Sequence, residues 1–231
     1  MKNNLIAHRG LHDKTIPENS MKAFKKALEY NLPIELDVHI LKDNSIAVFH
    51  DDNLKRMTGL DKNIIDSTYE EIRNLKLNNT DEIIPLLEDV LKLVDGKVLM
   101  DIELKYDHEK YRLEEALIEV LSKYNGEFIL KSFDYKTVKF LKKKTNYKVG
   151  LLIKNLESKN VSKREKFFFK SSLFINYIKP DFIACDYRIL DYKIIKKYKG
   201  KLPIYAWTIK NRELLEEIEG KADYYLVENI I

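Results

Sequence analysis

The chain has 231 residues, of which 45% are hydrophobic and 34% charged, so it can bury a sizeable core and is not of disordered composition. Its formal net charge of +4, from 41 basic and 37 acidic residues, is too small to indicate a nucleic-acid-binding protein. A single cysteine, Cys185, excludes an intrachain disulfide framework. Neither a signal-peptide-like segment nor a long apolar run occurs, so we expect no membrane span and a cytoplasmic location.

Short apolar runs alternate with amphipathic segments, a pattern typical of βα units and a parallel sheet. A run at Ile46–His50 follows the turn Lys42–Ser45 too closely for a crossover helix, so we expect it to return antiparallel beside the preceding strand. Without this hairpin strand, eight parallel strands remain, which is the number that closes a TIM barrel. The parallel strands are predicted at Leu5–His8, Ile34–His39, Val98–Leu104, Phe128–Ser132, Lys148–Leu152, Asp181–Cys185, Pro203–Trp207 and Tyr224–Val227.

Helices are predicted between these strands, and Ser67-Thr-Tyr-Glu70 is interpreted as a capping box that opens one of them. The last helix of an ordinary barrel is predicted to be absent or reduced to a turn. A second copy of the chain could cover the faces left apolar by its absence, which suggests a homodimer. With no linker and no repeat, residues 1–231 are predicted to form one barrel domain. The predicted helices are Met21–Leu28, Glu71–Leu77, Leu86–Val94, Leu113–Tyr124, Tyr135–Lys144, Arg164–Tyr177, Asp191–Lys199 and Arg212–Glu219.

Acidic side chains share one face of two predicted strands. Glu35 and Asp37 alternate along the second strand, and Glu103 lies on the next barrel strand. Two carboxylates about 4 Å apart repel each other by roughly 4 kcal/mol at an effective dielectric constant of 20, so the cluster needs a positive charge. Ion pairs with neighbouring Lys or Arg would supply it, and so would a bound cation. An all-carboxylate ligand set favours Mg²⁺ or Ca²⁺ over Zn²⁺.

Basic side chains and two histidines are predicted to gather at the same rim. His8 and Arg9 follow the first strand, and the hairpin returns His50 to that end of the barrel. Arg9 offers a fork for phosphate oxygens, Lys105 a point charge, and two histidines can move protons near neutral pH. This set of groups suits cleavage of a phosphodiester.

The motifs HRG, PENS, ELDVH, FHDD, IELK and YAWTI, in this order from His8 to Ile209, resemble the glycerophosphodiester phosphodiesterase family. The resemblance implies a TIM barrel with one divalent metal ion, held by Glu35, Asp37 and Glu103. It also implies that His8 and His50 are the general acid–base pair, and that Arg9 and Lys105 contact phosphate. Trp207 matches an aromatic residue that lines the substrate pocket. Ser20 stands where the family usually has Thr, which keeps a hydroxyl group.

The hypothesis that follows is metal-dependent hydrolysis of glycerophosphodiesters to sn-glycerol 3-phosphate and an alcohol. The metal and Arg9 would hold the phosphate oxygens, one histidine would deprotonate the glycerol 2-hydroxyl, and the other would protonate the departing alcohol. Water would then open the cyclic phosphate. Which histidine is the base stays open, as does direct attack by water. Two alternatives are a related phosphodiesterase for lysophospholipids or phosphoinositols, and a non-catalytic glycerophosphodiester-binding protein.

Overall fold

The computed structural model describes residues 4–107, 109–155 and 172–230. Contacts between Cα atoms group the chain into two units. One, called the N-terminal unit here, is Ala7–Ile129, and the other, the C-terminal unit, combines Met1–Ile6 with Leu130–Ile231. The boundaries fall inside two strands, β1 (Leu5–Ala7) and β5 (Phe128–Ser132). That one domain spans the whole chain stays a prediction.

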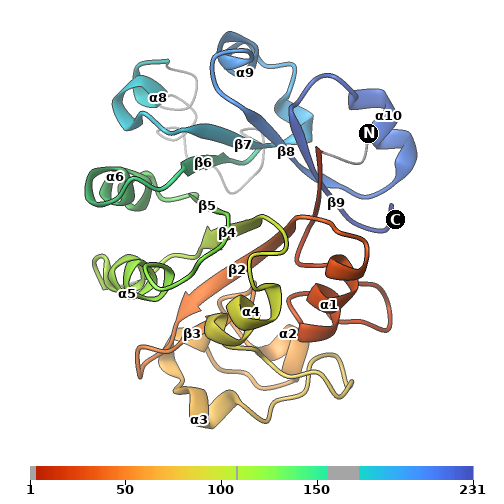
Figure 1. The fold of residues 1–231 in the computed structure, drawn as a ribbon, viewed down its shortest axis with the longest axis vertical. Helices are drawn as coiled ribbons and strands as arrows, with labels where there is room; N and C mark the ends of the chain where they lie inside the picture. The colour runs from red at the N-terminus through yellow and green to blue at the C-terminus, as the bar shows by residue number, and fades with distance from the viewer. Residues whose placement is uncertain (1–3, 108, 156–171, 231) are drawn as a thin grey trace. The chain divides into compact units, whose positions relative to one another are not determined.

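Strand β2 (Ile34–Ile40) is the centre of the N-terminal unit (Figure 1). It pairs in parallel with β1, where Ala7 lies opposite Ile34, and with β4 (Met100–Leu104). Its other pairing, with β3 (Ile46–Val48), is antiparallel. The helical segments of this unit are α1 (Met21–Glu29), α2 (Lys55–Thr58), η2 (Ile64–Asp66), α3 (Tyr69–Ile72), α4 (Leu87–Val94) and α5 (Arg112–Leu121).

In the C-terminal unit, each strand from β5 onwards pairs in parallel with the next strand along the chain. These strands are β6 (Val149–Ile153), β7 (Phe182–Asp186), β8 (Ile204–Ile209) and β9 (Tyr224–Val227). The connections carry α6 (Tyr135–Lys144), α8 (Ser172–Ile178), η3 (Tyr187–Ile189), α9 (Lys193–Tyr198) and α10 (Arg212–Ile218). Of the helix predicted at Arg164–Tyr177, the part before residue 172 lies outside the described residues.

The order of the strands is β1-β9-β8-β7-β6-β5-β4-β2-β3, with an additional pairing of β1 with β2. Among the described residues, β3 is the strand that pairs antiparallel, and the remaining strands are those of a (β/α)8 barrel. The predicted barrel with an extra hairpin strand after the second strand is therefore confirmed. Between β9 and residue 230 the described chain forms no further helix.

Local sequence explains how the first βα unit forms. The Ser20 side chain accepts a hydrogen bond from Ala23 N and caps α1. Ala23, Phe24 and Ala27 form its buried face. Gly10 has a φ of +77°, and a Cβ atom there would lie 2.8 Å from Ala23 Cβ. Only glycine therefore lets the chain after β1 pass this close to α1.

The helix predicted at Glu71–Leu77 is wrong in extent and in its cap. The observed α3 is a single turn, and its capping box joins Thr68 to Glu71, one residue later than expected. The Ser67 hydroxyl instead donates to Asn63 O and closes the preceding turn. Beyond α3, Lys76 pairs with Ile83 in an isolated β-bridge, which needs extended backbone and ends the helix.

The segment between β3 and α4 contributes to a small hydrophobic core of its own, here called the insertion core. It lies beside the hairpin and anchors the short helix α2 through Leu54 and Met57. A short insertion can therefore hold a fixed conformation, because its apolar side chains are buried. The insertion core consists of Leu41, Ala47, Phe49, Leu54, Met57, Ile64, Ile72, Leu77 and Ile84.

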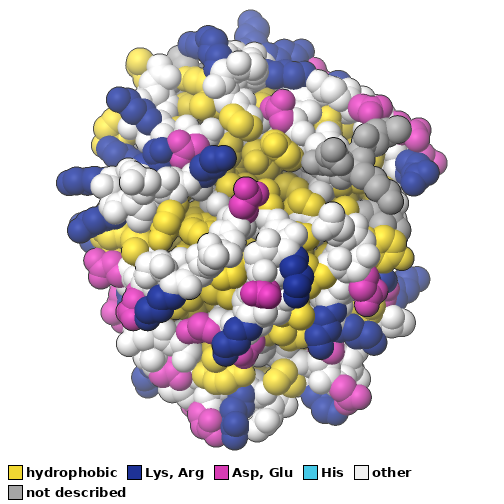
Figure 2. All heavy atoms as spheres, in the orientation of Figure 1, with side chains coloured by type: hydrophobic (Ala, Val, Ile, Leu, Met, Phe, Trp, Pro, Cys, Tyr) yellow, Lys and Arg dark blue, Asp and Glu magenta, His cyan; other side chains and the backbone are white. Residues whose placement is uncertain are grey.

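Within residues 4–107, 109–155 and 172–230, no helix has the length and hydropathy needed to cross a bilayer. The face drawn in Figure 2 carries acidic and basic side chains interspersed with apolar and neutral ones.

Replacing Gly10 by Ala should lower the free energy of unfolding by about 2–4 kcal/mol, because the methyl group meets Ala23 and the backbone keeps a positive φ. Gly59→Ala is the matched control, since Gly59 has a φ of +80° and nothing within 4 Å of the added Cβ. It should cost about 1 kcal/mol. Urea unfolding measures both, and equal losses would contradict the proposed close packing at Gly10.

Candidate active site

The three predicted metal-ligating carboxylates lie together in the N-terminal unit. Asp37 on β2 is directly opposite Glu103 on β4, and Glu35 lies two residues before Asp37 on the same face. Glu35 and Asp37 are 0% and 1% exposed, and Glu103 is 7% exposed. One oxygen from each carboxylate lies within 4.8 Å of the others. The strand register therefore gathers three buried acidic groups at one point.

Two cations compensate part of this negative charge. Lys105 Nζ lies 2.7 Å from Asp37 Oδ1 and 2.5 Å from Glu103 Oε1, and Arg9 Nε lies 3.4 Å from Asp37 Oδ2. Burial alone would raise the pKa of Asp37, but the charges of Lys105 and Arg9 outweigh it and hold that pKa below its usual value. Burial would lower the pKa of Lys105, yet Asp37 and Glu103 raise it above its usual value.

Arg9 is held from both its backbone and its side chain. Its backbone N–H donates to Glu35 Oε2 at 2.9 Å, and Nη1 donates to Glu18 Oε1 at 2.8 Å. Its φ of 54° is in the left-handed region, which is unfavourable for arginine. The Glu18 carboxylate therefore restrains the Arg9 side chain.

Asn19, in the same PENS segment, is a contact that sequence reasoning missed. It is 1% exposed, its Nδ2 donates to Asp37 Oδ2 at 2.8 Å, and its backbone N–H donates to Arg9 O at 3.0 Å. Its φ of 54° is one that asparagine tolerates better than most residues. The amide therefore links the turn before α1 to the carboxylate on β2.

The hairpin places His50 beside a chain of charged groups. His50 Nδ1 lies 2.6 Å from Asp51 Oδ1, and Asp51 accepts hydrogen bonds from Arg56 on α2. Burial would raise the pKa of Asp51, but the hydrogen bonds from Arg56 and His50 lower it to about 2. A carboxylate at Nδ1 leaves Nε2 as the nitrogen available for proton transfer.

His39 has surroundings different from those of His50. It is 3% exposed, and its Nε2 lies 3.4 Å from the carbonyl oxygen of His50. Burial, followed by the charge of Lys105, lowers the pKa of His39 to about 4. A neutral imidazole therefore packs against the backbone that carries His50.

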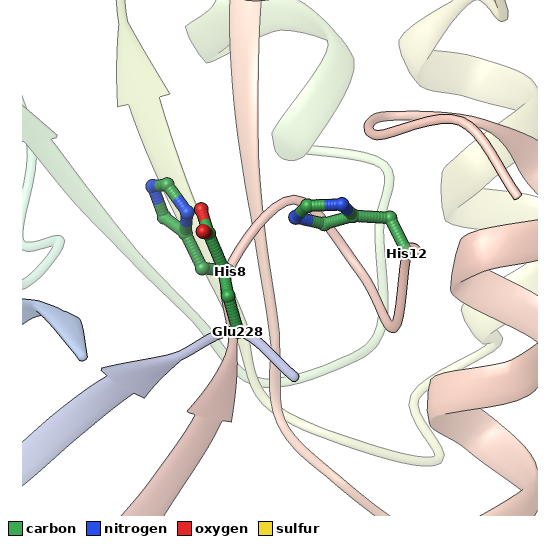
Figure 3. A group of neighbouring side chains, drawn as sticks. All are labelled: His8, His12 and Glu228. Atoms are coloured by element: carbon green, nitrogen blue, oxygen red, sulfur yellow. The ribbon is translucent and has the colours of Figure 1, made fainter. Parts of the chain in front are cut away.

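His8 follows β1 directly and is 7% exposed. Its Nε2 lies 3.9 Å from Glu35 Oε2, beyond hydrogen-bond distance but close enough for an electrostatic interaction. Figure 3 shows its imidazole with that of His12, from the loop that follows, and ring nitrogens of the two lie within 4.8 Å.

The predicted aromatic residue Trp207 lies on β8 in the C-terminal unit. The other seven predicted site residues belong to a different unit and are distant from it in sequence. The Trp207 ring meets Phe133 edge-to-face, with centroids 5.7 Å apart. The other seven, His8, Arg9, Glu35, Asp37, His50, Glu103 and Lys105, all belong to the N-terminal unit.

Sequence reasoning did not predict the contacts of three residues, Asn19, Asp51 and Arg56. The sequence offers different amounts of evidence for each of them. Asn19 was inside a recognised motif, and Asp51 directly follows His50. Arg56 carried no signal, because its partner Glu18 is 38 residues away in the sequence and its helix is one turn long.

Known proteins resemble this chain in sequence. The model of the glycerophosphoryl diester phosphodiesterase family matches residues 8–229. A glycerophosphodiester phosphodiesterase of Caldanaerobacter subterraneus is 31% identical over 94% of this chain and 90% of its own length. A lysophospholipase D of Homo sapiens is 33% identical over 54% of this chain and 42% of its own length.

Solved structures share the fold. A glycerophosphodiester phosphodiesterase of Thermotoga maritima matches with a TM-score of 0.77 at 28% identity, covering 96% of this chain and 93% of its own. A phosphodiesterase of Oleispira antarctica, solved with the product sn-glycerol-3-phosphate, matches with a TM-score of 0.81 at 19% identity, covering 97% and 92%. The latter likeness concerns the fold alone.

The barrel fold and the similarity in sequence define the chain as a barrel phosphodiesterase. The chain belongs to the glycerophosphoryl diester phosphodiesterase family. The predicted family and the prediction of an enzyme, a phosphodiester hydrolase, are therefore confirmed.

Asp51 should contribute acid-sensitive stability. Its pKa in the folded protein, about 2, is below the ordinary value of 3.8, so its contribution is present above pH 4 and is lost as the pH falls towards 2. Asp51→Asn should remove about 1–2 kcal/mol of this dependence, and Arg56→Met should flatten it similarly. Urea unfolding at pH 5 and pH 2.5 measures how much the free energy of unfolding falls between these pH values. A fall as large as that of the wild type in both variants would refute the role of Asp51.

Proposed function

We propose that this chain hydrolyses glycerophosphodiesters to sn-glycerol 3-phosphate and an alcohol, with His8 and His50 as the acid–base pair. The observation that carries the proposal is the convergence of Glu35, Asp37 and Glu103 with two cations in the N-terminal unit. Such a site can balance the charge of a phosphodiester while two imidazoles exchange protons with it. Membership of the family supplies the glycerol part of the substrate.

The three carboxylates fit one divalent cation. Two ligand oxygens on the same Mg²⁺ or Ca²⁺ can lie at most about 4–5 Å apart, and these oxygens lie within 4.8 Å of one another. Glu35, Asp37 and Glu103 would hold the ion, whose charge would stabilise the phosphate oxygens during the reaction. Hard carboxylate oxygens suit Mg²⁺ and Ca²⁺ equally, so both ions are candidates.

The protein's own residues would then act as follows. Arg9 and Lys105 orient the non-bridging oxygens of the phosphate. One histidine removes the proton of the glycerol 2-hydroxyl, whose oxygen attacks phosphorus as the bond to the alcohol oxygen breaks. The other histidine gives its proton to the oxygen of the departing alcohol. Water then opens the cyclic phosphate to glycerol 3-phosphate. Asp51 at Nδ1 of His50 favours Nε2 as the nitrogen that exchanges the proton.

His8→Ala and His50→Ala should each lower kcat about 10²- to 10⁴-fold with glycerophosphocholine and Mg²⁺, because each removes a proton-transfer group. The assay measures release of choline and of glycerol 3-phosphate. Thermal unfolding and cation affinity should change little. Turnover near that of the wild type in either variant would sink the role of that histidine. Turnover only with lysophosphatidylcholine would favour the lysophospholipid alternative.

Cation binding can be tested without the reaction. Isothermal titration should detect binding of one Mg²⁺ or Ca²⁺ per chain, weakened at least tenfold in Asp37→Asn and in Glu103→Gln, since each removes a charged ligand. Asp61→Asn is the control, because Asp61 is 65% exposed and its carboxylate accepts hydrogen bonds from Lys55 and Asn53. If the control and the site variants lose affinity alike, the three carboxylates are not the binding site.

A cytoplasmic location and a homodimer belong to the same proposal. The single cysteine suits a reducing compartment, which cell fractionation would test. Light scattering at micromolar concentration measures the oligomeric state, and a strict monomer would rule out the homodimer.

A further inference from the structure

Arg56 forms a fork between two carboxylates. Its Nη2 donates to Glu18 Oε1 at 2.7 Å and its Nη1 to Glu18 Oε2 at 3.2 Å. Its Nε donates to Asp51 Oδ2 at 2.5 Å, and Nη2 also reaches Asp51 Oδ1 at 3.0 Å. The planar guanidinium group thereby bridges the PENS turn and the end of the hairpin.

Each carboxylate has a second partner that belongs to the proposed machinery. Glu18 Oε1 also accepts from Arg9 Nη1 at 2.8 Å, and Asp51 Oδ1 also contacts His50 Nδ1 at 2.6 Å. A continuous line of hydrogen bonds therefore runs from Arg9 through Glu18, Arg56 and Asp51 to His50. Its ends are the phosphate-contacting arginine and one of the acid–base histidines.

The helix that carries Arg56 is fixed in place despite its short length. Leu54 and Met57, on either side of Arg56, are 0% and 3% exposed within the insertion core. The loop around α2 is closed by hydrogen bonds from Leu54 N to Lys62 O and from Ile64 N to Asp52 O. The backbone at Arg56 is therefore anchored by burial, although its side chain is 48% exposed.

The electrostatics of this line agree with its geometry. The hydrogen bond that Arg56 donates to Asp51, followed by the one it donates to Glu18, raises the pKa of Arg56 above its usual value. Burial would raise the pKa of Glu18, but Arg56 and Arg9 hold it below its usual value. The lowered pKa values of Glu18 and Asp51 both favour the ionised carboxylates, which accept these hydrogen bonds.

We propose that Arg56 is a positioning residue that sets two reacting side chains at once: His50 through Asp51, and Arg9 through Glu18. The inference rests on the proposed function for the roles of His50 and Arg9. It assigns Arg56 no contact with the substrate. Its effect is to fix the carboxylate that selects the His50 tautomer and the carboxylate that directs the Arg9 fork towards the phosphate.

An ordinary surface ion pair predicts something different. An exposed pair between long side chains contributes little to stability and nothing to turnover. Partners that orient groups in an active site, by contrast, typically change activity 10- to 100-fold when removed. The helix itself offers the comparison, because Lys55 forms an exposed pair with Asp61 at 2.8 Å and touches neither Glu18 nor Asp51.

The experiment compares Arg56→Met, Arg56→Lys and the control Lys55→Met in the full chain with Mg²⁺ and glycerophosphocholine. Arg56→Met should lower kcat about 10- to 100-fold while KM changes less than threefold. Arg56→Lys should recover only part of the loss, because an ammonium group cannot fork to both carboxylates. Lys55→Met should keep kcat within twofold of the wild type.

A mutant cycle tests whether Arg56 acts through the two carboxylates. If Arg56 acts through Asp51 and Glu18, then Arg56→Met should cost far less in Asp51→Asn/Glu18→Gln than in the wild type. Equal loss in both backgrounds would overturn the proposal. A rise in KM with kcat unchanged would overturn the positioning of His50, because displacement of a proton-transfer group lowers kcat. If Arg56→Met does not fold, Arg56→Gln takes its place in the same cycle.

A readout independent of turnover distinguishes this inference from the proposed function. The chain has five histidines, so the ring ¹⁵N signals of His50 can be assigned by comparison with His50→Gln. They should show one tautomer, protonated at Nδ1, in the wild type and Lys55→Met, and a tautomer mixture in Arg56→Met. Unchanged signals in Arg56→Met would refute the positioning of His50. This spectral change in a chain with no diesterase activity would instead refute the proposed function.

Discussion

The need of three buried carboxylates for positive charge is the constraint on which the rest of the site depends. Glu35, Asp37 and Glu103 are almost fully buried and lie within reach of one ion, and such groups are costly without compensation. Lys105 directly follows the strand that carries Glu103, whereas Arg9 comes from the turn after β1. The compensating charges therefore come from separate segments of the chain. The buried carboxylate cluster can form only when the first βα unit and β4 are in place together. Ion pairs and cation binding were alternatives at the level of sequence. Under the proposed function they are complementary, because one lysine and one arginine cannot neutralise three carboxylates and also a phosphodiester.

The hairpin after β2 solves a problem that the repeating βα unit does not. The β2–β3 turn and the insertion core return the chain to the site and deliver His50, Asp51 and Arg56 from one short segment. The hydrogen bond from Phe49 N to Asp37 O ties the end of this hairpin directly to the strand that carries the acidic groups. His39, neutral because burial lowers its pKa, supports the same backbone without adding charge beside Lys105. The insertion therefore combines the proposed proton-transfer group, His50, with its supporting contacts, while its own apolar side chains stabilise it.

The sequence predicted the parts of this arrangement that strand periodicity controls. Alternation along Ile34–His39 put Glu35 and Asp37 on one face, and the short turn before Ile46 identified the hairpin strand. Periodicity says less about single turns: the capping box of α3 was placed one residue early, since Ser67 and Thr68 are both suitable caps and tertiary contacts decided between them. Arg56 could not be predicted at all, because an exposed arginine on a one-turn helix has no pattern. Its meaning comes from Glu18, which only the folded chain brings within hydrogen-bond distance.

The charged groups of the N-terminal unit divide into an inner and an outer set with different physical roles. The inner pair of Lys105 with Asp37 is almost fully shielded from water, so its interaction is strong and hardly screened by salt. The outer fork of Arg56 is half exposed, so its interaction energy is modest and its directionality matters more. Arg9 and Glu18 connect the two sets. Strong attraction alone would leave Arg9 free to collapse onto the carboxylates. Glu18, itself held by Arg56, accepts a hydrogen bond from Arg9 Nη1 and so restrains the guanidinium group that, in the proposed reaction, orients the phosphate.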